Sequence, residues 1–213
     1  MGNVKFWLIV SCLVIVAASL LYLRPVPKIQ VELALQPTVT GSAVSLPWPS
    51  YGQGALAAQG YGQLQSHGQQ KAVPIASVAK VITALAVLKE KPLQTGQSGP
   101  NITITSDDVA IYNDYYSRDG SVIKVIEGKQ LSEYQALQAL LIPSANNIAD
   151  TLARWAFGSQ EAYITYANKM VKDMGLGKTT VADASGFSPK SISSASDLAM
   201  LGLAAMDNLV ITS

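Results

Sequence analysis

The sequence is poor in the residues that most often build disulfide frameworks, metal centres and histidine-based active sites. It has one cysteine, Cys12, and one histidine, His67, among 213 residues. Because Cys12 lies inside an apolar run and no cysteine follows it, the rest of the chain forms no internal disulfide. A Ser-His-Asp mechanism and a zinc site are therefore not supported. We expect His67 to lie on an exposed strand.

An excess of charge of either sign is also missing. The formal net charge is +1, which gives no basic surface of the kind that captures nucleic acid. Three of the 15 basic residues, Lys5, Arg24 and Lys28, lie in residues 1–28 without any acid, which leaves 12 basic against 14 acidic residues. The body of the chain is therefore predicted to be a near-neutral globular domain, and no nucleic-acid partner is expected.

One long hydrophobic run, residues 6–23, contains no charge, proline or glycine. Eighteen helical residues rise ~27 Å, which is close to the hydrocarbon thickness of a bilayer. The small residues at 16–18 would suit cleavage of a signal peptide, but residues 20–23 continue the apolar run past them, which a cleaved signal does not need. For residues 1–28 we favour a retained membrane anchor over a signal peptide.

Proline and glycine divide the remainder of the chain. Residues 29–50 are rich in proline and read as a linker, and residues 51–213 are predicted to form one domain. Residues 54–69 resemble two short strands joined by a turn. The apolar spacing then predicts a strand at 102–105 and helices that begin at Ser77 and Ser106. Apolar spacing and capping residues predict four further helices, at 131–141, 147–157, 160–174 and 194–206.

Strand signals followed by helices predict a mixed α/β or α+β domain. No strand pattern follows the helices, so the early hairpin is expected to keep an unpaired edge. We take this as a first indication that the sequence is incomplete at its C-terminal end.

Ser77 and Lys80 form the strongest candidate for chemistry. Residues three apart on a helix share a face, so the Lys80 amine can reach the Ser77 hydroxyl. A lysine can activate such a serine when burial or nearby positive charge makes its neutral form accessible. Ser77 also begins the helix, which leaves its backbone N–H free for an oxyanion. Alone the pair is a weak signal, because a capping serine followed by a solvated lysine gives the same pattern.

A second candidate is the turn that contains Ser144 and Asn146. Pro143 disfavours helix at Ile142, which predicts a turn between two helices. A serine hydroxyl can relay a proton, and an asparagine amide can both donate to and accept from a peptide bond. An ordinary helix-capping turn would have the same pattern.

Taken together, the two elements resemble the Ser-x-x-Lys and Ser-x-Asn motifs of penicillin-binding proteins and related serine β-lactamases. Pro74–Ala84, Leu141–Asn146 and Ser193–Ala199 are most similar to phrases of the serine D-Ala-D-Ala carboxypeptidase family, the low-molecular-mass penicillin-binding proteins. Asp183–Phe187 resembles the loop before the last phrase, and the resemblance covers residues 51–206. It implies the α/β (α+β) DD-peptidase-like fold: an antiparallel sheet with packed helices, a helical subdomain, and the site between them.

The resemblance implies acyl transfer at the end of a peptidoglycan stem peptide. Ser77 would attack the carbonyl of the penultimate D-Ala while Lys80 takes its proton, and Ser144 would relay a proton to the leaving D-Ala. Asn146 would hold the substrate amide and help to position Lys80. β-Lactams would acylate Ser77, and no metal or organic cofactor is needed. The implied location is the bacterial cell envelope, on the extracytoplasmic face of the cytoplasmic membrane.

One part of the family's pattern is missing, a Lys-Thr-Gly element on a later strand. Its lysine helps to bind the substrate carboxylate, and its strand supplies the second oxyanion donor. Lys178-Thr179-Thr180 is the only near match, and we interpret it as a decoy. We expect the sequence to be a fragment; the alternative is a truncated protein that does not turn over substrate.

Two other functions stay open. A serine β-lactamase is disfavoured because no Glu-x-x-Leu-Asn segment follows Asn146. A non-catalytic module that binds peptidoglycan is supported only by the missing Lys-Thr-Gly. Tyr112, Tyr115 and Tyr116 could line a substrate groove, but packed rings with wet hydroxyls are the commoner arrangement.

Overall fold

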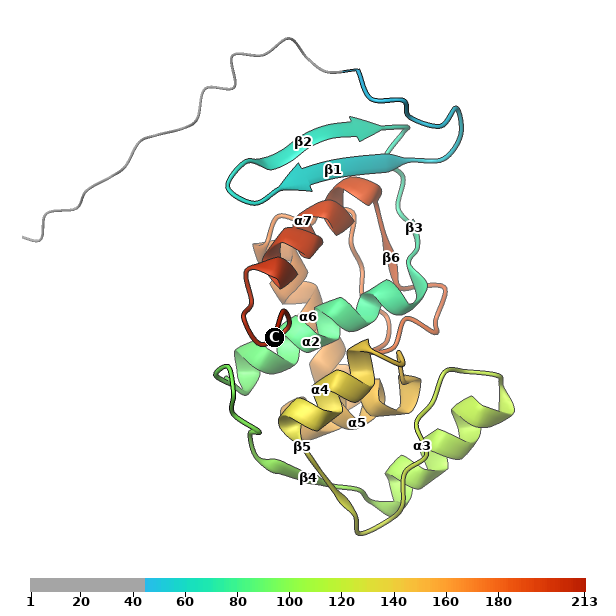
Figure 1. Ribbon diagram of the computed structural model, residues 1–213. Coiled ribbons are helices and arrows are strands. Elements are labelled where there is room, and N and C mark those ends of the chain that lie inside the picture. The colour runs from blue at the N-terminus through green and yellow to red at the C-terminus, as the bar shows by residue number, and fades with distance from the viewer. Residues whose placement is uncertain (1–44) are drawn as a thin grey trace, which may run out of the picture. The chain divides into compact units, whose positions relative to one another are not determined.

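The computed structural model describes residues 45–213 (Figure 1). The predicted anchor at 6–23 and most of the predicted linker at 29–50 lie outside this range, so both remain predictions. Within the described range, no helix is long and apolar enough to cross a membrane. The chain from Pro47 onward forms one unit.

The predicted hairpin at 54–69 is present. Strands β1 (Gly54–Ala58) and β2 (Gly62–His67) pair antiparallel, and the Tyr61 N–H closes the turn on the Ala58 carbonyl at 3.0 Å. Helix α7 (Ala195–Met206) packs against both strands (Figure 1). Among the described residues this sheet has only two strands, so the unpaired edge expected from the sequence is there.

Helix α2 (Ala79–Glu90) lies at the centre of the helical packing. Its alanines at 79, 84 and 86 are fully buried, and side chains of this size let neighbouring helices approach closely. Four helices contact it: α4 (Glu133–Leu141), α5 (Asn146–Phe157), α6 (Gln160–Asp173) and α7. Helix α2 is therefore packed against several neighbours, and the predicted nucleophile lies just before its N-terminal end.

Two further strand pairs connect segments that are distant in sequence. Strand β3 (Val73–Pro74) pairs with β6 (Ile192–Ser193), and β4 (Asn101–Thr103) pairs with β5 (Gln130–Ser132). Strand β6 follows α6, so the expectation that no strand follows the helices was wrong. A two-residue strand carries no periodicity, which is why the sequence did not reveal it.

The predicted helices are present, with small shifts at their ends. Helices α5, α6 and α7 differ from the predicted ranges by one residue, and α3 (Ser106–Ser117) begins where it was expected. Helix α4 begins at Glu133 rather than 131 because Ser132 caps it and the residues before it pair with β4. The helix predicted from Ser77 begins as a 3-10 turn, η1 (Ala76–Val78), before α2.

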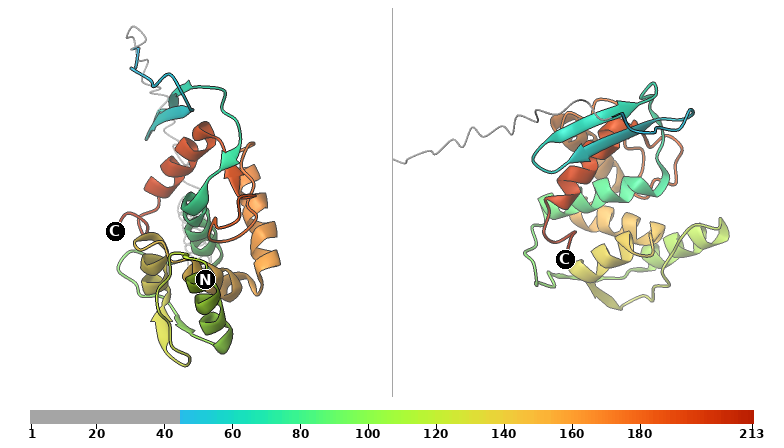
Figure 2. Two further views of the ribbon diagram at one scale, coloured as in Figure 1. Left: turned by 90° about the vertical axis from the view of Figure 1, so that its right-hand side faces the viewer. Right: turned by 45° about the horizontal axis from the view of Figure 1, so that its top comes forward.

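The elements form two groups on either side of α2. The hairpin and α7 lie on one side, while α3, α4, α5 and the β4–β5 pair form a helical subdomain on the other (Figures 1 and 2). This is the mixed α/β arrangement that the sequence pattern predicted, with the helical subdomain that the family resemblance implied. It places the start of α2 between the two groups.

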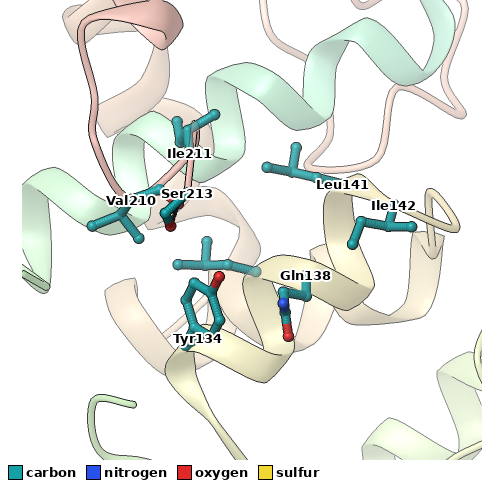
Figure 3. A pocket seen from close by; sticks show the side chains of 8 residues that line it. Tyr134, Gln138, Leu141, Ile142, Val210, Ile211 and Ser213 are labelled. Atoms are coloured by element: carbon teal, nitrogen blue, oxygen red, sulfur yellow. Dashed lines mark hydrogen bonds between the residues drawn. The ribbon is translucent and has the colours of Figure 1, made fainter. Parts of the chain in front are cut away.

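A small cavity of about 120 Å³ lies between α4 and the last described residues of the chain (Figure 3). Its walls are mainly apolar and include Leu137, Leu141, Val210 and Ile211. None of the predicted catalytic residues lines it. This cavity therefore belongs to the packing of α4 and is separate from the chemistry.

Candidate active site

Ser77 and Lys80 meet at the start of α2. Ser77 is exposed on η1, whereas Lys80, one turn later, is only 2% exposed. The Lys80 Nζ lies 3.0 Å from the Ser77 Oγ. The three-residue spacing thus produces the predicted contact between an accessible hydroxyl and a buried amine, rather than a capping serine beside a solvated lysine.

Three oxygens surround the Lys80 amine. Besides Ser77 Oγ, Nζ donates to Asn146 Oδ1 at 2.7 Å and to the Ser185 carbonyl at 2.9 Å. Burial lowers the pKa of Lys80 from 10.5 to about 8, although the negative charges of Asp183 and Asp150 act to raise it. Because burial disfavours the ammonium, a neutral amine beside the serine becomes accessible near neutral pH.

The predicted turn at 142–145 carries Ser144 and Asn146 to the same place. Helix α4 ends at Leu141, and Ser144 adopts a left-handed conformation (φ +59°) just before α5 begins. The Ser144 Oγ is buried and has no hydrogen-bond partner within residues 45–213. Its donor and acceptor capacity therefore remains available to a further group.

The loop at 183–188 supplies the third acceptor of Lys80, and Asp183 organises it. The Asp183 carboxylate accepts from the Ser185 hydroxyl at 2.9 Å and from the backbone N–H groups of Phe187 and Ser188 at 2.7 and 3.1 Å. A carboxylate that accepts several bonds from one short segment fixes its path. The Ser185 carbonyl is thereby held toward Lys80.

The same loop presses against the turn that carries Ser77. Gly186 has φ +73°, and a β-carbon there would lie 1.8 Å from the Ala76 carbonyl oxygen. Ala76 itself has φ +46°, an uncommon value for a residue with a side chain. The backbone next to the predicted nucleophile is therefore unusual, and only glycine fits opposite it.

Asn147 is a structural neighbour of the site. Its side chain accepts from the Ile123 N–H at 3.1 Å and donates to the Ile123 carbonyl at 2.9 Å. The backbone N–H of Asn146 donates to the Ser121 carbonyl at 2.7 Å. Together these bonds hold the segment after α3 against the start of α5.

Comparison with known proteins agrees with this geometry. Residues 62–213 match the sequence model of a family described as D-alanyl-D-alanine carboxypeptidase. The chain belongs to the D-alanyl-D-alanine carboxypeptidase family. The family predicted from the Ser-x-x-Lys and Ser-x-Asn elements is thus confirmed.

The similarity to individual members of the family extends over part of this chain and part of each relative. A D-alanyl-D-alanine endopeptidase of Haemophilus influenzae is 32% identical over 65% of this chain and 44% of its own. A D-alanyl-D-alanine carboxypeptidase structure from Mycobacterium tuberculosis is 26% identical, with a TM-score of 0.60 over 75% of this chain and 56% of its own. Penicillin binding protein 6B of Escherichia coli, 22% identical, shares the fold with a TM-score of 0.68 over 78% of this chain and 52% of its own.

These comparisons confirm the predicted fold class, the DD-peptidase fold. The chain spans less than half the length of the curated relatives that it matches. The activity of those whole proteins is therefore a proposal for this chain.

The residues Lys178–Thr180 of this family member are structural, in agreement with their interpretation as a decoy. The Lys178 amine donates to the Gln70 carbonyl at 2.6 Å, and Thr179 donates to Asp197 at 2.8 Å. Thr180 forms an isolated bridge with Ile192. Lys178 and Thr179 join Gln70 to the start of α7, Thr180 pairs with β6, and none of the three is a hydrogen-bond partner of Lys80.

His67 and the tyrosines take no direct part in the site. His67 lies on β2 as predicted, but its ring stacks on Trp48 at 5.7 Å, so it is half-buried rather than exposed. Tyr115 is buried, whereas Tyr116 is exposed and stacks on Tyr112 at 5.8 Å. Within residues 45–213, no cluster of His, Cys, Asp and Glu could hold a metal ion.

Sequence reasoning missed the contribution of residues 183–187 to the site. The Asp-Ala-Ser-Gly-Phe phrase resembles a loop of the family, but the sequence assigns no role to the Ser185 carbonyl or to Gly186. A backbone carbonyl that accepts a hydrogen bond cannot be recognised from the type of residue, because every residue has a carbonyl. The glycine that follows Ser185 is the one available signal.

Proposed function

We propose that this chain acts as a serine D-Ala-D-Ala carboxypeptidase on peptidoglycan stem peptides and reacts covalently with penicillins. The observation that carries the proposal is the 3.0 Å contact between the buried Lys80 amine and the exposed Ser77 hydroxyl. Membership of the D-alanyl-D-alanine carboxypeptidase family supports it. The neighbouring Ser144 and Asn146 supply the remaining polar groups.

The first chemical step is attack by Ser77 on the carbonyl of the penultimate D-Ala. The neutral Lys80 amine takes the Ser77 proton as the Oγ–carbon bond forms, and becomes an ammonium. The contact at 3.0 Å is within the reach that such a proton transfer requires. The pKa of Lys80, lowered to about 8, makes the base form accessible without removing its proton affinity.

The second step expels the terminal D-Ala. The carbon–nitrogen bond breaks as the leaving amine receives a proton, which passes from Lys80 by way of the Ser144 hydroxyl. Ser144 Oγ is suited to this relay because it has no other partner among the described residues. Water then hydrolyses the ester on Ser77 and releases the shortened peptide.

Asn146 has two functions in this scheme. Its Oδ1 accepts from Lys80 at 2.7 Å and so orients the amine toward Ser77. Its Nδ2 faces Gly120, where a β-carbon would lie 2.9 Å away, so a glycine leaves room beside it. We assign this amide N–H to the carbonyl of the substrate peptide.

The name of the Haemophilus influenzae relative favours a second leaving group. That protein is a D-alanyl-D-alanine endopeptidase. The acyl-enzyme step on Ser77 is the same in both reactions, because only the amine that departs from the D-Ala carbonyl differs. Incubation with stem peptides and with cross-linked dimers, followed by chromatography of the products, distinguishes release of D-Ala from cleavage of the cross-link.

The rate of Ser77 acylation by a penicillin should depend strongly on pH. Only neutral Lys80 accepts the serine proton, so the rate should rise about tenfold per pH unit below pH 8 and level off above it. Stopped-flow or gel-based labelling with a fluorescent penicillin between pH 6 and 9.5 measures this. A rate that is flat across this range would show that Lys80 is not the base.

We also propose that residues 6–23 anchor the protein to the extracytoplasmic face of the bacterial cytoplasmic membrane. The support is the uncharged apolar run itself and its continuation through Leu23. Membrane fractionation combined with protease treatment of intact spheroplasts tests the proposal. Recovery of a soluble form that lacks these residues would favour cleavage as a signal peptide instead.

A further inference from the structure

A chain of polar side chains adjoins Lys80 and reaches across three elements. Tyr115 of α3 donates to the Asp150 carboxylate of α5 at 3.0 Å, and its hydroxyl also lies 3.2 Å from Ser185 Oγ. Ser185 Oγ in turn donates to Asp183 at 2.9 Å. Because the carbonyl of Ser185 accepts from Lys80, the chain links α3 and α5 to the catalytic amine.

With both carboxylates ionised, the chain is one proton short. Two hydroxyls supply two protons, one from Tyr115 to Asp150 and one from Ser185 to Asp183. The contact between the two hydroxyl oxygens is then left without a hydrogen. A proton on Asp150 completes it, because Asp150 then donates to Tyr115, Tyr115 to Ser185, and Ser185 to Asp183.

Asp150 is the carboxylate placed to take this proton. Asp183 already accepts four hydrogen bonds, two from hydroxyls and two from backbone N–H groups. Burial raises the pKa of Asp150 to about 6, and the negative charge of Asp183 adds to this effect. The Tyr115 hydrogen bond, Arg154 and Gln160 act in the opposite direction.

Other charged and titratable groups border the chain. Asp183 and Asp150 both act on the Lys80 ammonium. Tyr163 of α6 is fully buried, and burial raises its pKa, as do the same two carboxylates. The Arg118 guanidinium lies 5.1 Å from the centre of the Tyr115 ring.

We propose that Tyr115 and Asp150 are positioning residues for Lys80. Both residues help to fix the Ser185 carbonyl, which accepts a hydrogen bond from the Lys80 amine. The charge of Asp150 also acts directly on that amine. This rests on the proposed function, in which Lys80 takes the Ser77 proton. Ionised Asp150 favours the ammonium form of Lys80. Protonated Asp150 removes that charge and completes the hydrogen-bonded chain to Ser185.

Titration of the Lys80 side chain by NMR tests the proposal without any need for enzymatic activity. In wild-type protein labelled with ¹³C-lysine, the Lys80 Cε signal should titrate near pH 8 and show a second, smaller inflection near pH 6. Asp150→Asn should abolish the inflection and lower the main midpoint by ~0.5 pH unit. Asp173→Asn, which removes an exposed carboxylate on α6, should change neither.

Three further variants separate the hydrogen bond from the charge. Tyr115→Phe should move the inflection to higher pH, because ionised Asp150 loses a donor, and should slow Ser77 acylation ~10-fold. Tyr116→Phe, on the exposed neighbour, should behave as wild type. Asp150→Glu keeps the charge and should restore the main midpoint.

The outcomes are distinct. If Asp150→Asn leaves both the Lys80 midpoint and the inflection unchanged, the proposal is wrong. If that variant does not fold, the proposal is wrong when Tyr115→Phe leaves the inflection at its wild-type pH. A wild-type protein that shows the titration but does not react with penicillin would overturn the proposed function and leave the positioning role standing.

Discussion

Replacement of Lys80 by methionine should slow the acylation of Ser77 at least ~1000-fold while the protein remains folded. Methionine has a similar length but cannot accept the Ser77 proton, and it leaves the Ser77, Asn146 and Ser185 oxygens without their common donor. Labelling with a fluorescent penicillin at pH 8.5 measures the loss. Lys89→Met, an exposed lysine on the same helix, is the matched control and should label as wild type.

The stability of the same variant relative to wild type should depend on pH. Lys80 keeps its proton to about pH 8 in the folded chain but to 10.5 in the unfolded one, so burial of its charge costs about 3 kcal/mol below pH 8. This cost falls as pH rises from 8 toward 10.5, because the folded amine is already neutral there. Urea unfolding should therefore show that the free energy of unfolding of Lys80→Met minus that of wild type is smaller at pH 9.5 than at pH 7.

Two results would contradict this account of Lys80. Labelling of Lys80→Met within tenfold of wild type would exclude Lys80 as the base. A stability difference that stays constant between pH 7 and 9.5 would show that the lysine carries no burial cost.

Gly186→Ala should destabilise the protein and disrupt the site together. The new methyl group would lie 1.8 Å from the Ala76 carbonyl oxygen, at a backbone angle of φ +73°. Backbone atoms cannot move aside as a flexible side chain can, so either the 183–188 loop or the turn before Ser77 must shift. We expect the free energy of unfolding to fall by about 2–3 kcal/mol beyond the cost of the angle itself, and acylation to fall with it.

Gly175→Ala provides the matched control for that substitution. Gly175 has nearly the same angle, φ +77°, but nothing lies within 4 Å of its added β-carbon. It should therefore show only the cost of the left-handed conformation, about 1 kcal/mol, and normal labelling. Equal stability and equal labelling of the two variants would show that the contact between the loop and Ala76 does not matter.

The parts of the fold that could be predicted from sequence are those governed by local patterns. The helices over 147–157 and 160–174 followed from apolar spacing, and Pro143 correctly ended the helix before Ser144. The contact between Ser77 and Lys80 followed from a three-residue spacing that η1 and α2 both preserve. In each case the interacting residues are close together in the sequence, within one or two helical turns.

The parts that could not be predicted depend on contacts between distant segments. Strands β3 and β6 are two residues each and pair across more than a hundred positions, so no periodicity marks them. The Ser185 carbonyl reaches Lys80 across a similar separation. Asp150 lies on a helix face like many surface acids, and only its half-buried position beside Tyr115 distinguishes it.

The most direct test of the account is to locate the covalent adduct after the protein reacts with a penicillin. Peptide mass spectrometry of the product should place one penicilloyl group on Ser77, and Ser77→Ala should prevent its formation. An adduct on another residue, or none after prolonged incubation at pH 8.5, would contradict the claim that Lys80 makes Ser77 a nucleophile.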